Sequence, residues 1–186
     1  MNILEEKQTK ATKYYDRFSI VYDWISSKSY YKKPRDFAFE KLNLSNNQLV
    51  LNIPCGTGQN FEYYQKFLSN SGKIIGIDLS QGMLEKAKEK IKKNNWNNIQ
   101  TFKENATKID SEWIKKEFKA ELKFESIFCD LGLSGFPKWE EVIDNLISLL
   151  KTNGKIVIMD WYIEKPSFRG NFIKWIGKGE VNRKLY

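Results

Sequence analysis

Five short apolar segments alternate with segments of helical spacing along the chain. At residues 49–53, for example, Leu49, Val50, Leu51 and Ile53 follow one another with a single polar interruption. Runs of this kind are typical of strands that are covered on both faces, as in a parallel sheet. The predicted strands are residues 49–53, 73–78, 98–106, 124–133 and 155–162.

Helical patterns fill three of the intervals between these strands. Residues 81–94 place their apolar side chains on one helical face, and Ser80 precedes them as the predicted N-cap. Residues 59–68 have similar spacing, and residues 137–150 are followed by Asn153-Gly154, which is typical of a left-handed C-cap. The alternation predicts an α/β fold with a doubly wound, mostly parallel sheet and helices on both faces.

The chain contains no internal repeat, low-complexity tract or Gly/Ser linker. We therefore expect residues 1–186 to form a single domain, with an N-terminal helical cap (1–45), a core (46–163) and a basic C-terminal segment (164–186). Right-handed crossovers would bring the C-terminal ends of the strands to one edge of the sheet, where ligands bind in folds of this class.

The residue inventory excludes several kinds of chemistry. The chain has no histidine, which rules out a Ser-His-Asp or Cys-His pair and histidine-ligated zinc, and with only two cysteines we expect no metal site. Cys55 and Cys129 each lie near the end of a predicted strand, which favours reduced thiols in a cytoplasmic protein. We expect neither a secretory signal nor a membrane-spanning segment.

A net charge of +8 is compatible with an acidic partner, either nucleic acid or an anionic membrane. The basic residues form no dense cluster, which argues against nucleic acid and favours a charge spread over the surface. Residues 164–186 are a local exception, since six basic residues accompany two acidic ones and Phe168, Phe172 and Trp175 share one helical face. Such a segment could lie on an anionic membrane, and docking on the sheet is the alternative.

The segment IPCGTG, residues 53–58, joins the first strand to the helix that follows. Gly56 and Gly58 allow the backbone to approach a ligand closely because they carry no side chain. A pyrophosphate-binding G-x-G-x-x-G turn would need a third glycine, but Phe61 occupies that position. Asp78 ends the second strand, where a carboxylate can accept hydrogen bonds from both hydroxyls of a ribose. The two features predict a nucleoside site.

Five segments follow one another in the order and spacing of a single family: VLNIPCGTG, IIGIDLSQGMLEKAK, FKENATKI, FCDLGLSGFPKWEEVI and LKTNGKIVIMD. Together they resemble the class I S-adenosylmethionine-dependent methyltransferases. YYDRFSIVYDW and LGLSGFPKW further resemble the quinone C-methyltransferases and the bacterial phospholipid N-methyltransferases. The resemblance implies a Rossmann-like fold, S-adenosylmethionine as cofactor and S-adenosylhomocysteine as product.

The resemblance also implies roles for individual residues. Gly56 and Gly58 would let the backbone pass under the methionine part of the cofactor, Asp78 would hold the ribose, and Leu79 and Met83 would contact the adenine. Residues 105–106 would lie at the adenine edge, and residues 129–131 beside the sulfonium. The implied cofactor-binding residues are Tyr22 (or Tyr15), Asn52, Pro54, Cys55, Gly56, Gly58, Asp78, Leu79, Met83, Asn105, Ala106, Thr107, Cys129, Asp130 and Leu131. No catalytic residue is assigned.

The chain departs from the family pattern in three places. Asn52 and Asn105 stand where the family usually has acidic residues, although an Asn carbonyl oxygen can still accept a hydrogen bond from an amine. The family's sheet also carries two more strands after the fifth, and the given sequence stops at Tyr186, too soon for both. We therefore expect the last one or two strands to be absent. Either the chain is a truncated form, or a partner, such as a second copy, covers the exposed edge of strand five.

We predict methyl transfer from S-adenosylmethionine to a small-molecule or lipid acceptor of the quinone or phospholipid-amine type. The protein would be cytoplasmic, with peripheral membrane contact left open. One alternative is a catalytically decayed binding module, which the two asparagines and the short C-terminal region favour. A second alternative is an RNA methyltransferase, which would draw on the net charge. A dehydrogenase fits worst because the third glycine is absent.

Overall fold

The computed structural model describes residues 6, 9–17, 19, 31–68 and 71–160. Residues 9–17 are helical and are called the N-terminal helix below. The other elements are α2 Lys32–Leu42, β1 Leu49–Asn52, α3 Phe61–Leu68, β2 Lys73–Asp78, α4 Gln81–Lys93, β3 Ile99–Lys103, the 3-10 turn η1 Ala106–Lys108, α5 Ser111–Phe118, β4 Phe124–Asp130, the 3-10 turn η2 Leu133–Gly135, α6 Trp139–Ser148 and β5 Leu150–Met159.

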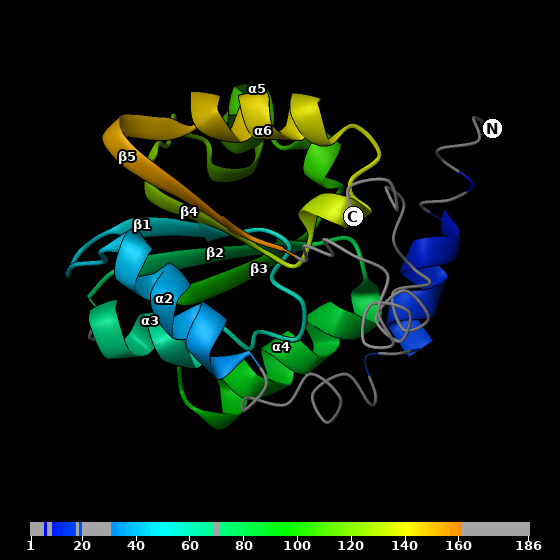
Figure 1. Ribbon diagram of the computed structural model, residues 1–186, viewed down its shortest axis with the longest axis horizontal. Helices are drawn as coiled ribbons and strands as arrows, with labels where there is room; N and C mark the ends of the chain where they lie inside the picture. The colour runs from blue at the N-terminus through cyan, green and yellow to red at the C-terminus, as the bar shows by residue number, and fades with distance from the viewer. Residues whose placement is uncertain (1–5, 7–8, 18, 20–30, 69–70, 161–186) are drawn as a thin grey trace.

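The strands form one sheet in the order β3-β2-β1-β4-β5, and each neighbouring pair is parallel. Helices α2, α3 and α4 cover one face of this sheet, whereas α5 and α6 cover the other (Figure 1). The chain forms β2 and β3 on one side of β1 and then crosses to the other side to form β4 and β5, so β1 lies at the centre. The predicted α/β fold with a doubly wound parallel sheet is therefore confirmed.

The apolar strands are explained by the helices on both faces. Val50 and Ile74 pack in the core with α2, α3 and α4, whereas Leu51 and Ile75 pack in the core with α5 and α6. Successive residues of a strand point to opposite faces, so a strand between two helical layers favours apolar side chains on both of its faces. The middle of the sheet is consequently packed on both faces, and polar side chains such as those of Asp78 and Asp130 lie at its C-terminal edge.

The end of α6 differs from the prediction. The helix ends at Ser148, and β5 begins at Leu150. Asn153 has a left-handed φ of 65°, but it lies inside β5, where the register with β4 shifts. The prediction of Asn153-Gly154 as a helix C-cap is therefore wrong, because the positive φ belongs to an irregularity in strand pairing.

Helix α5 is a second difference, since the sequence pattern predicts no helix between the third and fourth strands. Asp110 caps this helix by accepting a hydrogen bond from the Trp113 backbone N–H at 2.8 Å. Ile114 is the only buried residue among the eight of α5. The helix thus lacks the repeated apolar positions from which a helix is recognised in a sequence.

The turn between β1 and α3 uses its two glycines for different purposes. Both have positive φ, 53° at Gly56 and 75° at Gly58. A Cβ atom added at Gly56 would have no heavy atom within 4 Å, whereas one at Gly58 would lie 2.6 Å from two ring atoms of Phe61. Because Phe61 is fully buried, Gly58 is needed for core packing as well as for backbone conformation.

Alanine substitution of these two glycines should separate the two effects. Both variants carry the strain of a left-handed residue, about 1–2 kcal/mol, and Gly58→Ala adds overpacking of about 1–3 kcal/mol. We expect urea denaturation to give a lower free energy of unfolding for Gly58→Ala than for Gly56→Ala. Equal losses in the two variants would contradict this account of the turn.

Candidate functional site

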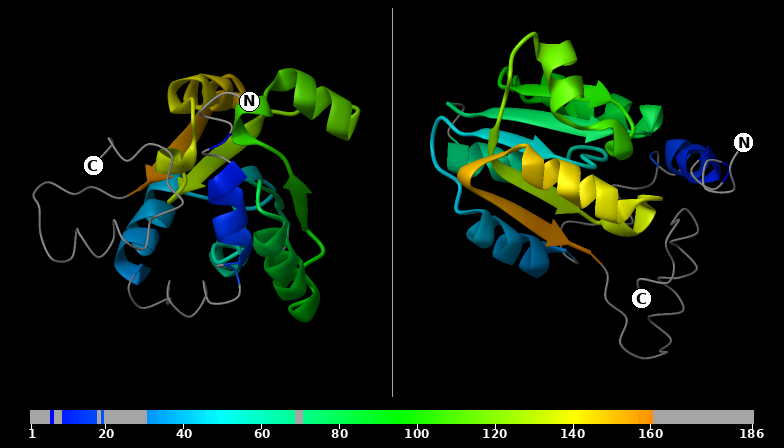
Figure 2. Two further views of the ribbon diagram at one scale, coloured as in Figure 1. Left: turned by 90° about the vertical axis from the view of Figure 1, so that its right-hand side faces the viewer. Right: turned by 90° about the horizontal axis from the view of Figure 1, so that it is seen from above.

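A cavity opens at the edge of the sheet where the parallel strands end. The turns after β1, β2, β3 and β4 line it, together with residues of the N-terminal helix. That helix lies next to the strand ends in both views of Figure 2. Segments that are far apart in sequence are thus brought together at the edge where the alternation of strands and helices predicts a ligand.

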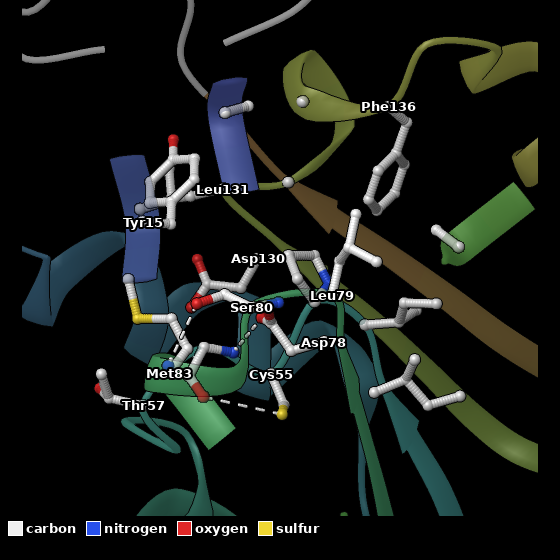
Figure 3. Close-up of a pocket in the computed structure, with 18 of the residues that line it drawn as sticks. Tyr15, Cys55, Thr57, Asp78, Leu79, Ser80, Met83, Asp130, Leu131 and Phe136 are labelled. Atoms are coloured by element: carbon white, nitrogen blue, oxygen red, sulfur yellow. Dashed lines mark hydrogen bonds between the residues drawn. The ribbon is translucent and has the colours of Figure 1, made fainter. Parts of the chain in front are cut away.

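Most of the residues that the resemblance implies are found in the cavity wall. They are Pro54, Cys55, Gly56, Asp78, Leu79, Met83, Asn105, Ala106, Asp130 and Leu131. Tyr15 also lines the cavity, whereas Tyr22 lies outside the described residues. Figure 3 shows Tyr15 and Phe136 on one side of the pocket and Cys55 and Met83 on the other, with Asp78 and Asp130 between them.

Four of the implied residues do not line the cavity: Asn52, Gly58, Thr107 and Cys129. Asn52 is fully buried, and its Nδ2 donates hydrogen bonds to the carbonyl oxygens of Pro54 and Phe128, each at 3.3 Å. Cys129 packs in the core with α5 and α6. Burial raises the pKa of both Cys129 and Cys55, so neither thiol is suited to act as a nucleophile.

Asp78 is the central polar residue of the cavity and is 9% exposed. Its Oδ2 accepts a hydrogen bond from the Gly56 backbone N–H, and its Oδ1 accepts one from the Ser80 backbone N–H, both at 2.8 Å. Burial raises the pKa of this carboxyl to about 6, and the two hydrogen bonds act in the opposite direction. Each carboxylate oxygen has capacity for a further hydrogen bond from a ligand.

Ser80 connects Asp78 to the N-terminal helix. Its hydroxyl accepts a hydrogen bond from the Met83 backbone N–H, which confirms the predicted N-cap of α4. The same hydroxyl donates to Asp16 Oδ1 at 2.6 Å, and the Gly82 backbone N–H donates to that oxygen at 3.1 Å. A Cβ at Gly82 would lie 2.7 Å from the Asp16 carbonyl oxygen, so the close approach of the helix requires glycine.

A second polar group in the wall joins Asp130, which the family motifs imply, to Arg35 and Asn60, which they do not. Arg35 of α2 forms an ion pair with Asp130 at 3.1 Å, and Asn60 Nδ2 donates to the same carboxylate oxygen at 2.9 Å. Arg35 stands on one face of α2 with Ala38, Phe39 and Leu42, which are all buried. A charged residue within such an apolar face is a sequence signal that would have revealed it.

No group of three or more potential metal ligands occurs among the residues that the structure describes.

This chain is similar in sequence to one family of proteins and in fold to several solved structures. The model of one protein family, described as "Methyltransferase domain", matches residues 44–176, which is more than half of the chain. An uncharacterized protein of Methanocaldococcus jannaschii, MJ0906, is 26% identical over 143 residues. A demethylmenaquinone methyltransferase of Oceanobacillus iheyensis is 25% identical over 146 residues.

The matches cover more of this chain than of the relatives. They include 77% and 78% of this chain, but only 36% of the archaeal protein and 56% of the bacterial one. Among solved structures, that of the DhpI–SAH complex superposes with a TM-score of 0.63 at 17% identity, over 84% of this chain and 69% of that one. At this identity the likeness concerns the fold.

The raised pKa of Asp78 makes stability depend on pH. Because the folded-state value of about 6 lies above the ordinary value of 3.8, the contribution of Asp78 to stability is present below pH 3.8 and is lost as the pH rises through about 6. Relative to Asp78→Asn, the wild type should lose about 2–3 kcal/mol of unfolding free energy between pH 4 and pH 7.5. Urea denaturation of both proteins at the two pH values measures this, and equal losses would contradict it.

Proposed function

The chain belongs to the methyltransferase domain family, and from this premise we propose that it binds S-adenosylmethionine in the cavity and transfers its methyl group to a small-molecule or lipid acceptor. The observation that carries the proposal is Asp78. Two backbone N–H groups fix its carboxylate in the cavity wall, where it can accept hydrogen bonds from the paired hydroxyls of a ribose.

The rest of the cavity wall fits the other parts of this cofactor. Leu79 and Met83 supply apolar surface beside Asp78 for an adenine ring. Gly56 leaves open space where another residue would place a side chain. The solved structure of DhpI, which has the same fold, is a complex with S-adenosylhomocysteine, and this supports the assignment by family.

When bound, S-adenosylmethionine supplies a methyl group on a sulfonium, which an acceptor can displace directly. The chain therefore needs no covalent nucleophile of its own, in keeping with its lack of histidine. Its residues would hold and align the reactants, a contribution that can reach about 7–11 kcal/mol of the barrier. The N-terminal helix, through Ala11, Thr12 and Tyr15, would exclude water from one side of the cavity.

For the acceptor we propose a quinone or a phospholipid amine. The name of the bacterial relative, a demethylmenaquinone methyltransferase, supports a quinone, and Leu131 and Phe136 supply apolar surface in the cavity. The basic C-terminal segment, 164–186, lies outside the described residues, and its contact with a membrane stays a prediction. In the described part of the chain, no helix has the length and apolar character to span a bilayer.

The alternative function is a binding module without turnover. Asn52 is engaged in holding the turn after β1, and the side chain of Asn105 caps η1 by accepting from the Thr107 backbone N–H at 3.1 Å. Neither residue supplies the negative charge that the family usually places there to attract a cationic cofactor. A module of this kind would bind the cofactor but would not transfer the methyl group.

Calorimetric titration with S-adenosylmethionine tests the cofactor site. The wild type should bind, and Asp78→Ala should raise the Kd about 10- to 100-fold because hydrogen bonds to a charged group are lost. Asp144→Ala is the matched control, since it removes an exposed carboxylate on α6 and should leave the Kd unchanged. Circular dichroism of each variant establishes that it is folded. A folded wild type that gives no binding would contradict the proposal.

An assay of methyl transfer distinguishes an enzyme from a module that only binds the cofactor. The protein is incubated with S-adenosylmethionine that carries a labelled methyl group and, in separate reactions, a quinone, phospholipid vesicles or a soluble amine. We expect label in the acceptor with the wild type and with Asp144→Ala, and a strong decrease with Asp78→Ala. Binding without label in any acceptor would favour the module.

A further inference from the structure

The end of β5 is connected by hydrogen bonds to the segment that follows β4 and contains the turn η2. Asp160 comes directly after β5, and its Oδ2 accepts a hydrogen bond from the Ser134 backbone N–H at 3.1 Å. The Leu131 backbone N–H, earlier in the same segment, donates to the Met159 carbonyl oxygen at 2.7 Å. Two groups at the end of β5 thus fix the chain where it leaves the neighbouring strand.

The same segment also packs against the glycine-containing turn after β1. A Cβ atom added at Gly132 would overlap the ring of Pro54, so the two turns are in close contact. A Cβ atom added at Gly135, in contrast, would meet no heavy atom within 4 Å, and Gly135 lines the cavity. The turn η2 is therefore held by Pro54 and Asp160, and it leaves open space toward a ligand.

The turn supplies a part of the cavity wall that the proposed cofactor contacts do not use. Ser134, Gly135 and Phe136 all line the cavity. Figure 3 shows Phe136 on the side of the pocket opposite Met83. Because the nucleoside is assigned to Asp78 and Met83, the side formed by η2 is left for the methyl acceptor.

Ser134 brings a hydroxyl group without a partner into this part of the wall. The residue is 2% exposed, and within the described residues its Oγ makes no hydrogen bond. Buried polar atoms are nearly always paired in native proteins. A serine hydroxyl can both donate and accept, so a polar atom of a ligand that packs on η2 would supply the missing partner.

The neighbouring groups narrow the chemistry of that ligand. Leu131 and Phe136 add apolar surface to the wall. Among the described residues of the wall, Arg35 is the only cationic one, and it is already paired with Asp130. A lipid phosphate against η2 would therefore lose its hydration without gaining a cationic partner. A hydroxyl group on an aromatic ring would satisfy Ser134 and cover the apolar surface at no such cost.

We propose that Asp160 is a positioning residue for the acceptor. It holds the turn η2 so that the Ser134 hydroxyl binds a ring hydroxyl of an aromatic acceptor, whose ring packs on Phe136. This inference rests on the proposed function. It narrows the two acceptor classes named there to the one with a hydroxylated ring, the reduced form of a quinone.

Transfer of the methyl group to 1,4-naphthoquinol, kept reduced during the assay, provides the test. Ser134→Ala should raise the KM of this acceptor about 3- to 10-fold, because one hydrogen bond between uncharged groups is lost, and leave that of S-adenosylmethionine within about twofold. Asp160→Ala should show the same selectivity and also lower kcat, since an incorrectly placed ring reacts more slowly.

A conservative variant separates positioning from a general role in stability. Asp160→Asn keeps a side-chain oxygen that can accept the hydrogen bond from the Ser134 backbone N–H. It should therefore retain an acceptor KM close to that of the wild type, whereas Asp160→Ala should not. Asp144→Ala on the surface of α6 is the control and should change neither KM. If Asp160→Ala does not fold, Ser134→Ala decides.

Three results would overturn the inference and leave the proposed function intact. The first is an equal change of both KM values in Ser134→Ala and Asp160→Ala, which would assign η2 a structural role. The second is an unchanged acceptor KM in Ser134→Ala. The third is label in phosphatidylethanolamine vesicles with none in the naphthoquinol. A folded wild type that does not bind S-adenosylmethionine, or that labels no acceptor, overturns the proposed methyl transfer and this inference together.

Discussion

The hydrogen bonds of one buried carboxylate hold together the two turns on which the candidate site is built. Asp78, at the end of β2, accepts from Gly56 in the turn after β1 and from Ser80 in the turn that leads to α4. Burial opposes ionisation of this carboxyl, and the two backbone donors offset part of that cost. The carboxylate is thereby fixed in the cavity wall, and its oxygens can still accept hydrogen bonds from a ligand.

The walls on either side depend on contacts that extend from these turns. Ser80 also binds Asp16, which keeps the N-terminal helix against the cavity, and Gly82 permits the close approach of the two backbones. At the end of β4, the ion pair between Arg35 and Asp130 connects α2 to the sheet. The parallel sheet brings these groups together because all of its strands end at the same edge (Figure 1).

The sheet could be predicted from sequence because two helical layers require continuous apolar strands. Helix α5 could not, since Asp110 caps a segment with a single buried residue. In the site, the motifs predict which turn residues are involved. They do not predict where each side chain points, because successive residues of a strand point to opposite faces. Cys129 faces the core of α5 and α6, whereas Asp130 lines the cavity. Arg35 escapes a motif search because its partner is distant in sequence and only the fold brings the two together.

The most direct test of the central claim is the crystal structure of the chain with S-adenosylhomocysteine. We expect the ligand at the C-terminal ends of β1, β2 and β4, with both ribose hydroxyls hydrogen-bonded to Asp78 and the adenine beside Leu79 and Met83. A ligand bound elsewhere, or in this cavity with its ribose turned away from Asp78, would contradict the account.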